Sequence, residues 1–383
     1  MTTNPILELT NLGQSVWIDY LDRGRIASGQ LKHRIEQDGL RGMTSNPSIF
    51  EKAISGDRCY DAIIDELARA GSSVAGIYEA MTTRDVQLAA DVFRPTFDRL
   101  DGRDGFVSLE VSPHLAHDTD GTVAEARRLW AEVDRPNVMI KVPATKAGLP
   151  AIQRLVSEGL NINVTLLFGL GRYEAVAEAY LAGLELRASQ GHPLKLASVA
   201  SFFLSRIDVL VDAKLDELER AGSIAPPLAA RLRGQVAIAS ARVAYKKYKG
   251  IFESERFKAL AAKGARPQRL LWASTSTKNP AYSDVKYVEA LIGDETINTV
   301  PFETFDAYRD HGAPELRLET HVDEAKEILA ELPAAGIDLD AITQRLEDDG
   351  VRKFAEAYDR LLQAIARRRE VALREARAGH VSS

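Results

Sequence analysis

One lysine of the sequence lies inside a short apolar run. Lys141 stands between Ile140 and Val142 in the segment Val138–Val142, whose composition is typical of a buried β-strand. A buried lysine is costly unless it is paired or has a function. Removal from water favours its neutral amine, which can attack a carbonyl carbon and form an imine. We therefore expect Lys141 to be a nucleophile, and a structural ion pair with Glu110 is the alternative interpretation.

Polar side chains at alternate positions of other apolar segments would share one basin with this lysine. Alternate residues of a β-strand point to opposite faces, and the inward residues of a barrel are normally apolar. Inward polar residues therefore need an explanation, which at the carboxyl ends of barrel strands is usually catalysis. The residues that we expect in this basin are Asp19, Glu110, Lys141, Asn163 and Thr165, joined from the rim by Asn46.

The protonated imine is an electron sink, so cleavage of a carbon–carbon bond would need a carboxylate rather than a metal ion. Asp19 or Glu110 could take and return the protons of such a reaction. Structural alternatives stay open for the same residues. Asp19 could cap a helix, Asn46 could be a turn residue, and Asn163 and Thr165 could bind loop backbone.

Eight short β-type runs alternate with helical stretches and would position these residues. This rhythm is typical of βα units around a parallel sheet, and eight strands favour a closed (β/α)8 barrel, the TIM barrel of the α/β class, over an open sheet. The expected strands lie near Ser15–Leu21, Gly42–Ser45, Phe106–Val111, Val138–Val142, Asn161–Leu166, Lys195–Ala200, Arg269–Thr275 and Thr296–Thr299.

Additional helices are expected after the sixth strand and at the carboxyl terminus. The excursion 207–263 contains two helical patterns, and residues 322–377 contain three. The last pattern has an apolar stripe that includes Phe354, which predicts that this helix covers part of the barrel mouth. No stretch resembles a flexible linker, so we expect residues 1–383 to form one domain. The five expected helices are Ile207–Arg220, Leu228–Tyr248, Val322–Leu332, Leu339–Asp348 and Gly350–Arg377.

Composition excludes several classes of protein. The formal net charge is −6, which argues against broad nucleic-acid binding. Cys59 is the single cysteine, so the chain can form neither an internal disulfide nor a cysteine-based metal site, and a reducing, cytoplasmic location fits best. The first residues lack the pattern of a signal peptide, and no run of about 18 apolar residues predicts a membrane span.

Two short motifs have only part of the pattern of a metal or cofactor site. His114 and His117 have H-x-x-H spacing, but Pro113 interrupts the helix that such a site needs and no third ligand stands out. Gly169 and Gly171 do not complete a dinucleotide-binding fingerprint. We therefore expect no metal and no cofactor.

A phosphate site is expected near the end of the sixth strand. Ser201 and Arg206 would lie just after that strand, close to the late-strand loops where barrels often bind phosphate. An ion pair between Arg206 and Asp208 is the structural alternative for the arginine.

Several segments resemble those of the transaldolase family, in family order and over nearly the whole chain. The resemblance implies an enzyme that forms a Schiff base with its substrate, and together the segments are far more specific than any one alone. The segments that carry it are 44–50 (TSNPSIF), 137–145 (NVMIKVPAT), 161–168 (NINVTLLF), 201–206 (SFFLSR) and 349–354 (DGVRKF).

The resemblance implies a chemical role for four residues. Lys141 would form the Schiff base. Asp19 would take the proton from the C4 hydroxyl as the C3–C4 bond breaks and return it to the acceptor. Glu110 would assist dehydration of the carbinolamine through an ordered water that Thr165 partly holds.

It also implies how the substrate is bound. Asn46 and Asn163 would donate hydrogen bonds to the dihydroxyacetone unit, and Ser201 and Arg206 would hold the phosphate. Many family members have an arginine after the seventh strand, where this chain has none, and Lys278 is the best substitute.

The implied reaction transfers a dihydroxyacetone unit between phosphorylated sugars without a cofactor. Donors would be sedoheptulose 7-phosphate or fructose 6-phosphate, and acceptors glyceraldehyde 3-phosphate or erythrose 4-phosphate, as in the pentose phosphate pathway. Two alternatives are a fructose 6-phosphate aldolase and a catalytically silent sugar-phosphate binding protein. A homodimer is possible, and neither nucleic acid nor a membrane is expected as a partner.

Overall fold

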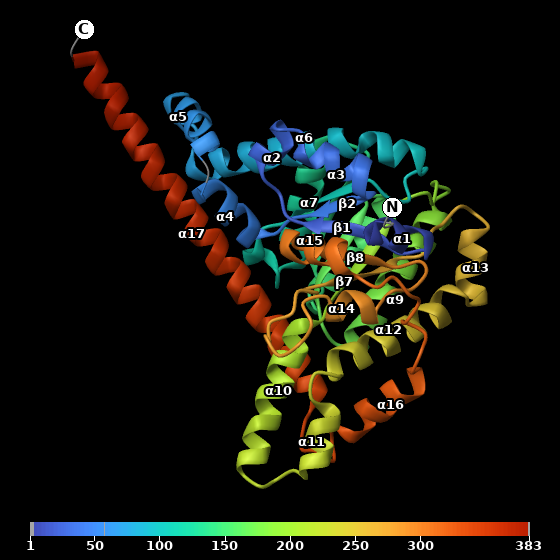
Figure 1. Ribbon diagram of the computed structural model, residues 1–383. Helices are drawn as coiled ribbons and strands as arrows, with labels where there is room; N and C mark the ends of the chain where they lie inside the picture. The colour runs from blue at the N-terminus through green and yellow to red at the C-terminus, as the bar shows by residue number, and fades with distance from the viewer. Residues whose placement is uncertain (1–3, 57, 382–383) are drawn as a thin grey trace.

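The eight predicted strands form a closed parallel barrel in the computed structural model, which describes residues 4–56 and 58–381 (Figure 1). Each strand pairs with the next, and β8 closes the barrel by pairing with β1. The predicted (β/α)8 fold is therefore confirmed. The strands are β1 Ser15–Asp19, β2 Gly42–Thr44, β3 Phe106–Glu110, β4 Val138–Pro143, β5 Ile162–Leu167, β6 Ser198–Phe203, β7 Arg269–Ala273 and β8 Ile297–Val300.

The barrel strands are buried on both faces because helices cover their outer side. In β4, Val138, Ile140 and Val142 are fully buried, as expected for a parallel strand that helices cover. The helices that precede, follow or separate the strands are α1 Pro5–Asn11, α2 Arg23–Ala27, α3 Gln30–Asp38, α4 Pro47–Gly56, η1 Arg58–Tyr60, α5 Asp61–Arg69, α6 Val74–Arg99, η2 Pro113–Leu115, α7 Thr119–Val133, α8 Gly148–Glu158, α9 Leu170–Ser189, α14 Lys286–Ala290 and α15 Phe302–His311.

The sixth strand begins three residues later than the sequence pattern predicts. The segment 195–197 was expected in the strand, but Leu196 N–H donates to the Leu194 carbonyl at 2.9 Å, which closes a tight turn there. The prediction of Lys195–Ala200 was therefore wrong at both ends. As a consequence, Ser201 lies within β6 and not after it.

The excursion after β6 contains four helices, where the sequence predicted two. These are α10 Ser205–Arg220, α11 Pro226–Leu232, α12 Val236–Phe252 and α13 Glu255–Ala261. The predicted helix Leu228–Tyr248 is broken at Gly234, which has a φ of +66°. Its N–H donates to Asp212 Oδ1 at 2.8 Å, so a carboxylate of α10 fixes the break.

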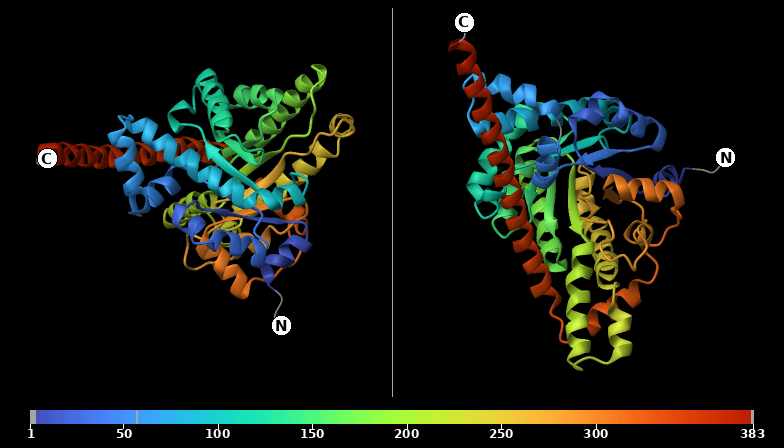
Figure 2. Two further views of the ribbon diagram at one scale, coloured as in Figure 1. Left: turned by 90° about the horizontal axis from the view of Figure 1, so that it is seen from above. Right: turned by 60° about the vertical axis from the view of Figure 1, so that its left-hand side comes forward.

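The chain ends in α16 Val322–Glu331 and the long helix α17 Leu339–Val381. Two helices were predicted where α17 is continuous through Gly350, so the predicted break was wrong. A Cβ at Gly350 would lie 2.8 Å from Leu166 Cδ2, so the glycine permits close packing of α17 on the end of β5. Figures 1 and 2 show α17 running from beside α10, past α4, to beside α5.

No helix within 4–56 or 58–381 is long and apolar enough to cross a membrane.

Candidate functional site

A cavity of about 280 Å³ lies at the carboxyl ends of the barrel strands. Of the predicted residues, those that line it come from β1, β4, β6 and the adjoining loops and helices. Glu110, Asn163 and Thr165 do not line the cavity and are buried in the strands around it. The predicted residues on its wall are Asp19, Asn46, Lys141, Ser201, Arg206 and Lys278.

Lys141 and Glu110 face each other on neighbouring strands, where they are register partners. Lys141 Nζ lies 3.7 Å from Glu110 Oε2 and donates to the Ser45 carbonyl at 3.0 Å. The ion pair that was the structural alternative for Lys141 is therefore present. It coexists with access of Lys141 to the cavity, so it leaves the amine within reach of a ligand.

Burial dominates the electrostatics of Glu110. Its pKa is raised from 4.5 to about 7, chiefly by desolvation; the ammonium of Lys141 opposes this rise, and the charge of Asp19 adds a smaller increase. Both carboxyl oxygens are buried without a hydrogen-bond partner among the described residues, and so is Thr165 Oγ1. Unpaired buried polar atoms are uncommon and often mark a functional group or a water position.

Asn163 is held from both sides inside the barrel. Its Nδ2 donates to Ser108 Oγ at 2.9 Å, and Ser201 Oγ donates to its Oδ1 at 2.7 Å. A side-chain amide has two N–H donors and an oxygen with two lone pairs, so each end keeps one bonding position. Ser201 has a single proton, which Asn163 uses here, so Ser201 must rotate before it can donate to a phosphate.

Asp19 is held by a threonine that the sequence argument missed. Thr44 Oγ1 donates to Asp19 Oδ1 at 2.7 Å and lies 2.8 Å from Thr299 Oγ1. The alternative role of Asp19 as a helix cap is wrong, because Asp22 caps α2 by accepting from Arg25 N–H at 2.8 Å. Inward alternation within β2 and β8 is the signal that would have identified both threonines.

Asn46 has the turn role and also lies at the cavity. Its Oδ1 accepts from Ile49 N–H at 3.0 Å and so caps the start of α4. Its amide nitrogen has no hydrogen bond among the described residues and remains available to a ligand in the cavity.

Three cationic side chains gather at the mouth of the cavity. Arg206 is half-buried, and desolvation lowers its pKa, against which the charges of Asp19 and Asp349 act. Partial burial lowers the pKa of Lys278, as do the charges of Arg206 and Lys52. Lys52 of α4 also lines the cavity, although the sequence gave no reason to select it from the surface lysines. The mouth is therefore suited to a phosphate group.

Phe354 of α17 completes the wall of the cavity. It is 3% exposed and comes from the helix whose apolar stripe predicted contact with the barrel mouth. Beside it, the Arg206 guanidinium lies 5.9 Å from the ring centroid of Phe203, another lining residue.

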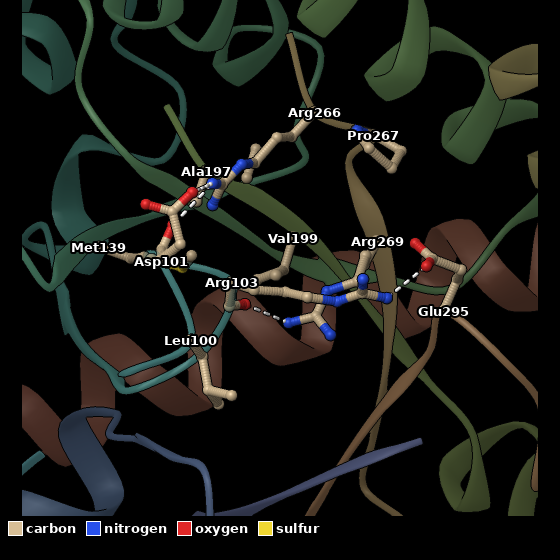
Figure 3. A pocket seen from close by; sticks show the side chains of 12 residues that line it. Leu100, Asp101, Arg103, Met139, Ala197, Val199, Arg266, Pro267, Arg269 and Glu295 are labelled. Atoms are coloured by element: carbon tan, nitrogen blue, oxygen red, sulfur yellow. Dashed lines mark hydrogen bonds and ion pairs between the residues drawn. The ribbon is translucent and has the colours of Figure 1, made fainter. Parts of the chain in front are cut away.

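A second cavity, of about 300 Å³, lies at the opposite end of the barrel (Figure 3). Its charged residues bind one another: Arg266 donates to Asp101 Oδ2 at 2.9 Å, and Arg103 pairs with Glu295. None of the predicted site residues lies there.

The described residues hold no cluster of three or more side chains suited to a metal ion. His114 Nε2 lies 2.8 Å from Asp359 Oδ1, so the H-x-x-H motif contributes to a contact between η2 and α17.

Comparison with known proteins agrees with this geometry. A family model described as "Transaldolase/Fructose-6-phosphate aldolase" matches residues 16–365. A transaldolase of Trichodesmium erythraeum is 48% identical over 371 residues, covering 95% of this chain and 97% of its own length. A transaldolase of Saccharopolyspora erythraea is 49% identical over 370 residues, covering 95% and 98%. The chain therefore belongs to the transaldolase/fructose-6-phosphate aldolase family.

Proposed function

We propose that this protein transfers a dihydroxyacetone unit from a ketose phosphate to an aldose phosphate through a Schiff base on Lys141. The observation that carries the proposal is a buried lysine at a barrel cavity, 3.7 Å from a carboxyl group with a raised pKa. The protein is an enzyme of the ketol-transferring class. Its relatives at 46–49% identity, which include the two proteins named above, are transaldolases. The reaction belongs to the pentose phosphate pathway.

The chemistry is divided between Lys141 and two carboxyl groups. The neutral amine attacks C2 of the ketose, and loss of water gives the protonated imine. Asp19 then takes the proton of the C4 hydroxyl while the C3–C4 bond breaks and its electrons move toward the imine nitrogen. The first aldose leaves, the enamine attacks the acceptor carbonyl, and Asp19 returns the proton. Because the imine is the electron sink, no step needs a cofactor.

Glu110 acts in the steps that add and remove water. A pKa of about 7 leaves the group divided between acid and base at neutral pH, which suits proton transfer in both directions. Its unpaired oxygens and the unpaired Thr165 Oγ1 support a water site between the two residues.

Binding of the sugar is assigned to the remaining polar residues of the site. Asn46 and Asn163 donate their spare amide N–H groups to the dihydroxyacetone unit. Arg206, Lys278 and Ser201 hold the phosphate, Arg206 as a planar fork and Lys278 as a point charge.

The family also contains fructose 6-phosphate aldolases, which hydrolyse the imine and release dihydroxyacetone. The assay that separates the two activities supplies fructose 6-phosphate with and without erythrose 4-phosphate. We expect sedoheptulose 7-phosphate only when the acceptor is present, and little free dihydroxyacetone without it. Rapid dihydroxyacetone release that an acceptor does not alter would assign the aldolase reaction, and failure of both would indicate a silent binding protein.

We further propose that residues 1–383 form one domain that acts in the cytoplasm. The single cysteine, Cys59, fits a reducing compartment.

A homodimer is the proposed assembly. Sedimentation equilibrium of the full chain tests it, and the mass of a monomer would contradict it.

A further inference from the structure

A chain of two hydroxyl groups leads to the carboxylate of Asp19. Thr299 Oγ1 lies 2.8 Å from Thr44 Oγ1, which donates to Asp19 Oδ1 at 2.7 Å. Thr44 is 1% and Thr299 is 3% exposed, and both line the cavity together with Asp19.

The direction of these hydrogen bonds follows from the number of protons. A carboxylate can only accept, and a threonine hydroxyl has one proton to give. The proton of Thr44 is used toward Asp19, so the contact between the two threonines requires Thr299 to be the donor. Thr299 thus fixes the rotation of the Thr44 hydroxyl and keeps the hydroxyl proton of Thr44 directed at Asp19 Oδ1.

The barrel brings the three residues together from three adjacent strands. β2 and β8 flank β1, with Thr44 in register with Asp19 and Thr299 in register with Trp17. Inward side chains of the two flanking strands converge inside a closed barrel. Asp19 Oδ2 has no hydrogen bond among the described residues, so one oxygen of the carboxylate is held and the other remains for a ligand.

We propose that Thr44 and Thr299 are positioning residues that hold Oδ1 of Asp19 so that Oδ2 exchanges the proton with the sugar hydroxyl. The proposal rests on the role proposed above for Asp19. Neither hydroxyl takes the proton itself, because an alcohol is a far weaker base than a carboxylate. The O–H bond of the sugar breaks, the O–H bond on Oδ2 forms, and the threonine protons stay in place.

Several charged groups face Asp19 around the cavity. They are Glu110 from β3, Lys141 from β4, Lys52 from α4, Arg206 from α10 and Lys278 from the loop after β7. The threonine substitutions below leave all five unchanged, so a change in the pH profile reports on the hydroxyl chain.

The test compares Thr44→Val and Thr44→Ser, using donor cleavage and transfer by the full-length enzyme. The valine variant should lower kcat about 10–100-fold with little change in KM, because it removes a hydrogen bond to a charged group. The acid limb of its kcat/KM profile should move to higher pH, since a carboxylate that loses a donor is protonated more readily. The serine variant should restore both properties.

Thr299→Val should also lower kcat and move the acid limb of the kcat/KM profile to higher pH, but by less than Thr44→Val. It replaces Thr44→Val as the test if that variant does not fold. Thr122→Val is the matched control, because Thr122 of α7 is a buried threonine whose hydroxyl donates to the Leu115 carbonyl at 2.9 Å, outside the cavity that holds Asp19, Thr44 and Thr299. Its acid limb should stay in place.

Wild-type kcat and an unshifted acid limb in Thr44→Val would overturn the inference. Equal losses in the valine and serine variants would do so as well, because they would indicate packing. If the wild-type enzyme itself lacked acceptor-dependent transfer, the proposed function would fail instead, so the two failures are distinguishable.

Discussion

Replacement of Glu110 by glutamine should make the protein more stable at neutral and alkaline pH while lowering its activity. Glu110 is 7% exposed, its carboxyl oxygens have no hydrogen-bond partner among the described residues, and its pKa is raised from 4.5 to about 7. Glutamine has nearly the same shape and no charge to bury, so it removes the cost of ionising the group inside the barrel.

The size and sign of the effect follow from linkage. Between pH 4.5 and 7 the folded protein keeps a proton that the unfolded chain has released, so the stabilising contribution of Glu110 is lost as pH rises through this range. A shift of about 2.5 units corresponds to about 3 kcal/mol, at about 1.36 kcal/mol per unit. The stability of Glu110→Gln relative to wild type should therefore increase from pH 4.5 to pH 8 and then level off.

Urea unfolding of both proteins at several pH values measures this difference directly. Turnover at pH 7 should fall about 10²–10⁴-fold in the same variant, because a positioned acid–base group is lost. Stability curves that run parallel in pH, or a relative stability of the variant that falls as pH rises, would refute the account of Glu110.

Three other substitutions test the remaining parts of the site. Asp19→Asn should fold normally and lose about 10²–10⁴-fold in turnover, and near-wild-type turnover would remove Asp19 from the proton transfer. Lys278→Ala should raise KM for fructose 6-phosphate up to about 10-fold and barely change KM for fructose, with a larger selective effect in Arg206→Ala; equal effects on both substrates would place Lys278 outside the phosphate site. Phe354→Leu should widen the mouth and increase release of free dihydroxyacetone without acceptor, and an unchanged release would show that Phe354 does not exclude water.

Much of the barrel and its central residues could be predicted from the sequence because alternation in strands is a local signal. Polar residues at inward positions of apolar runs identified Asp19, Lys141 and Asn163, and parallel pairing brought them to one region. The same signal was present at Thr44 and Thr299, but threonine is common in strands and did not stand out.

Features that depend on distant contacts could not be predicted in this way. Gly350 looked like a helix break, and only its packing on Leu166 explains why α17 continues through it. Gly234 looked compatible with one helix, and its interaction with Asp212 of another helix fixes the break. Lys52 has no local feature of a site residue, because its place at the cavity depends on how α4 docks.

Trapping of the covalent intermediate tests the central claim most directly. Incubation with fructose 6-phosphate and borohydride, followed by peptide mapping, should find a reduced three-carbon adduct on Lys141. Lys146, five residues away, is the internal control and should remain unmodified. An adduct on Lys146 or on any other lysine in place of Lys141, or no adduct in an enzyme that turns over, would contradict the account.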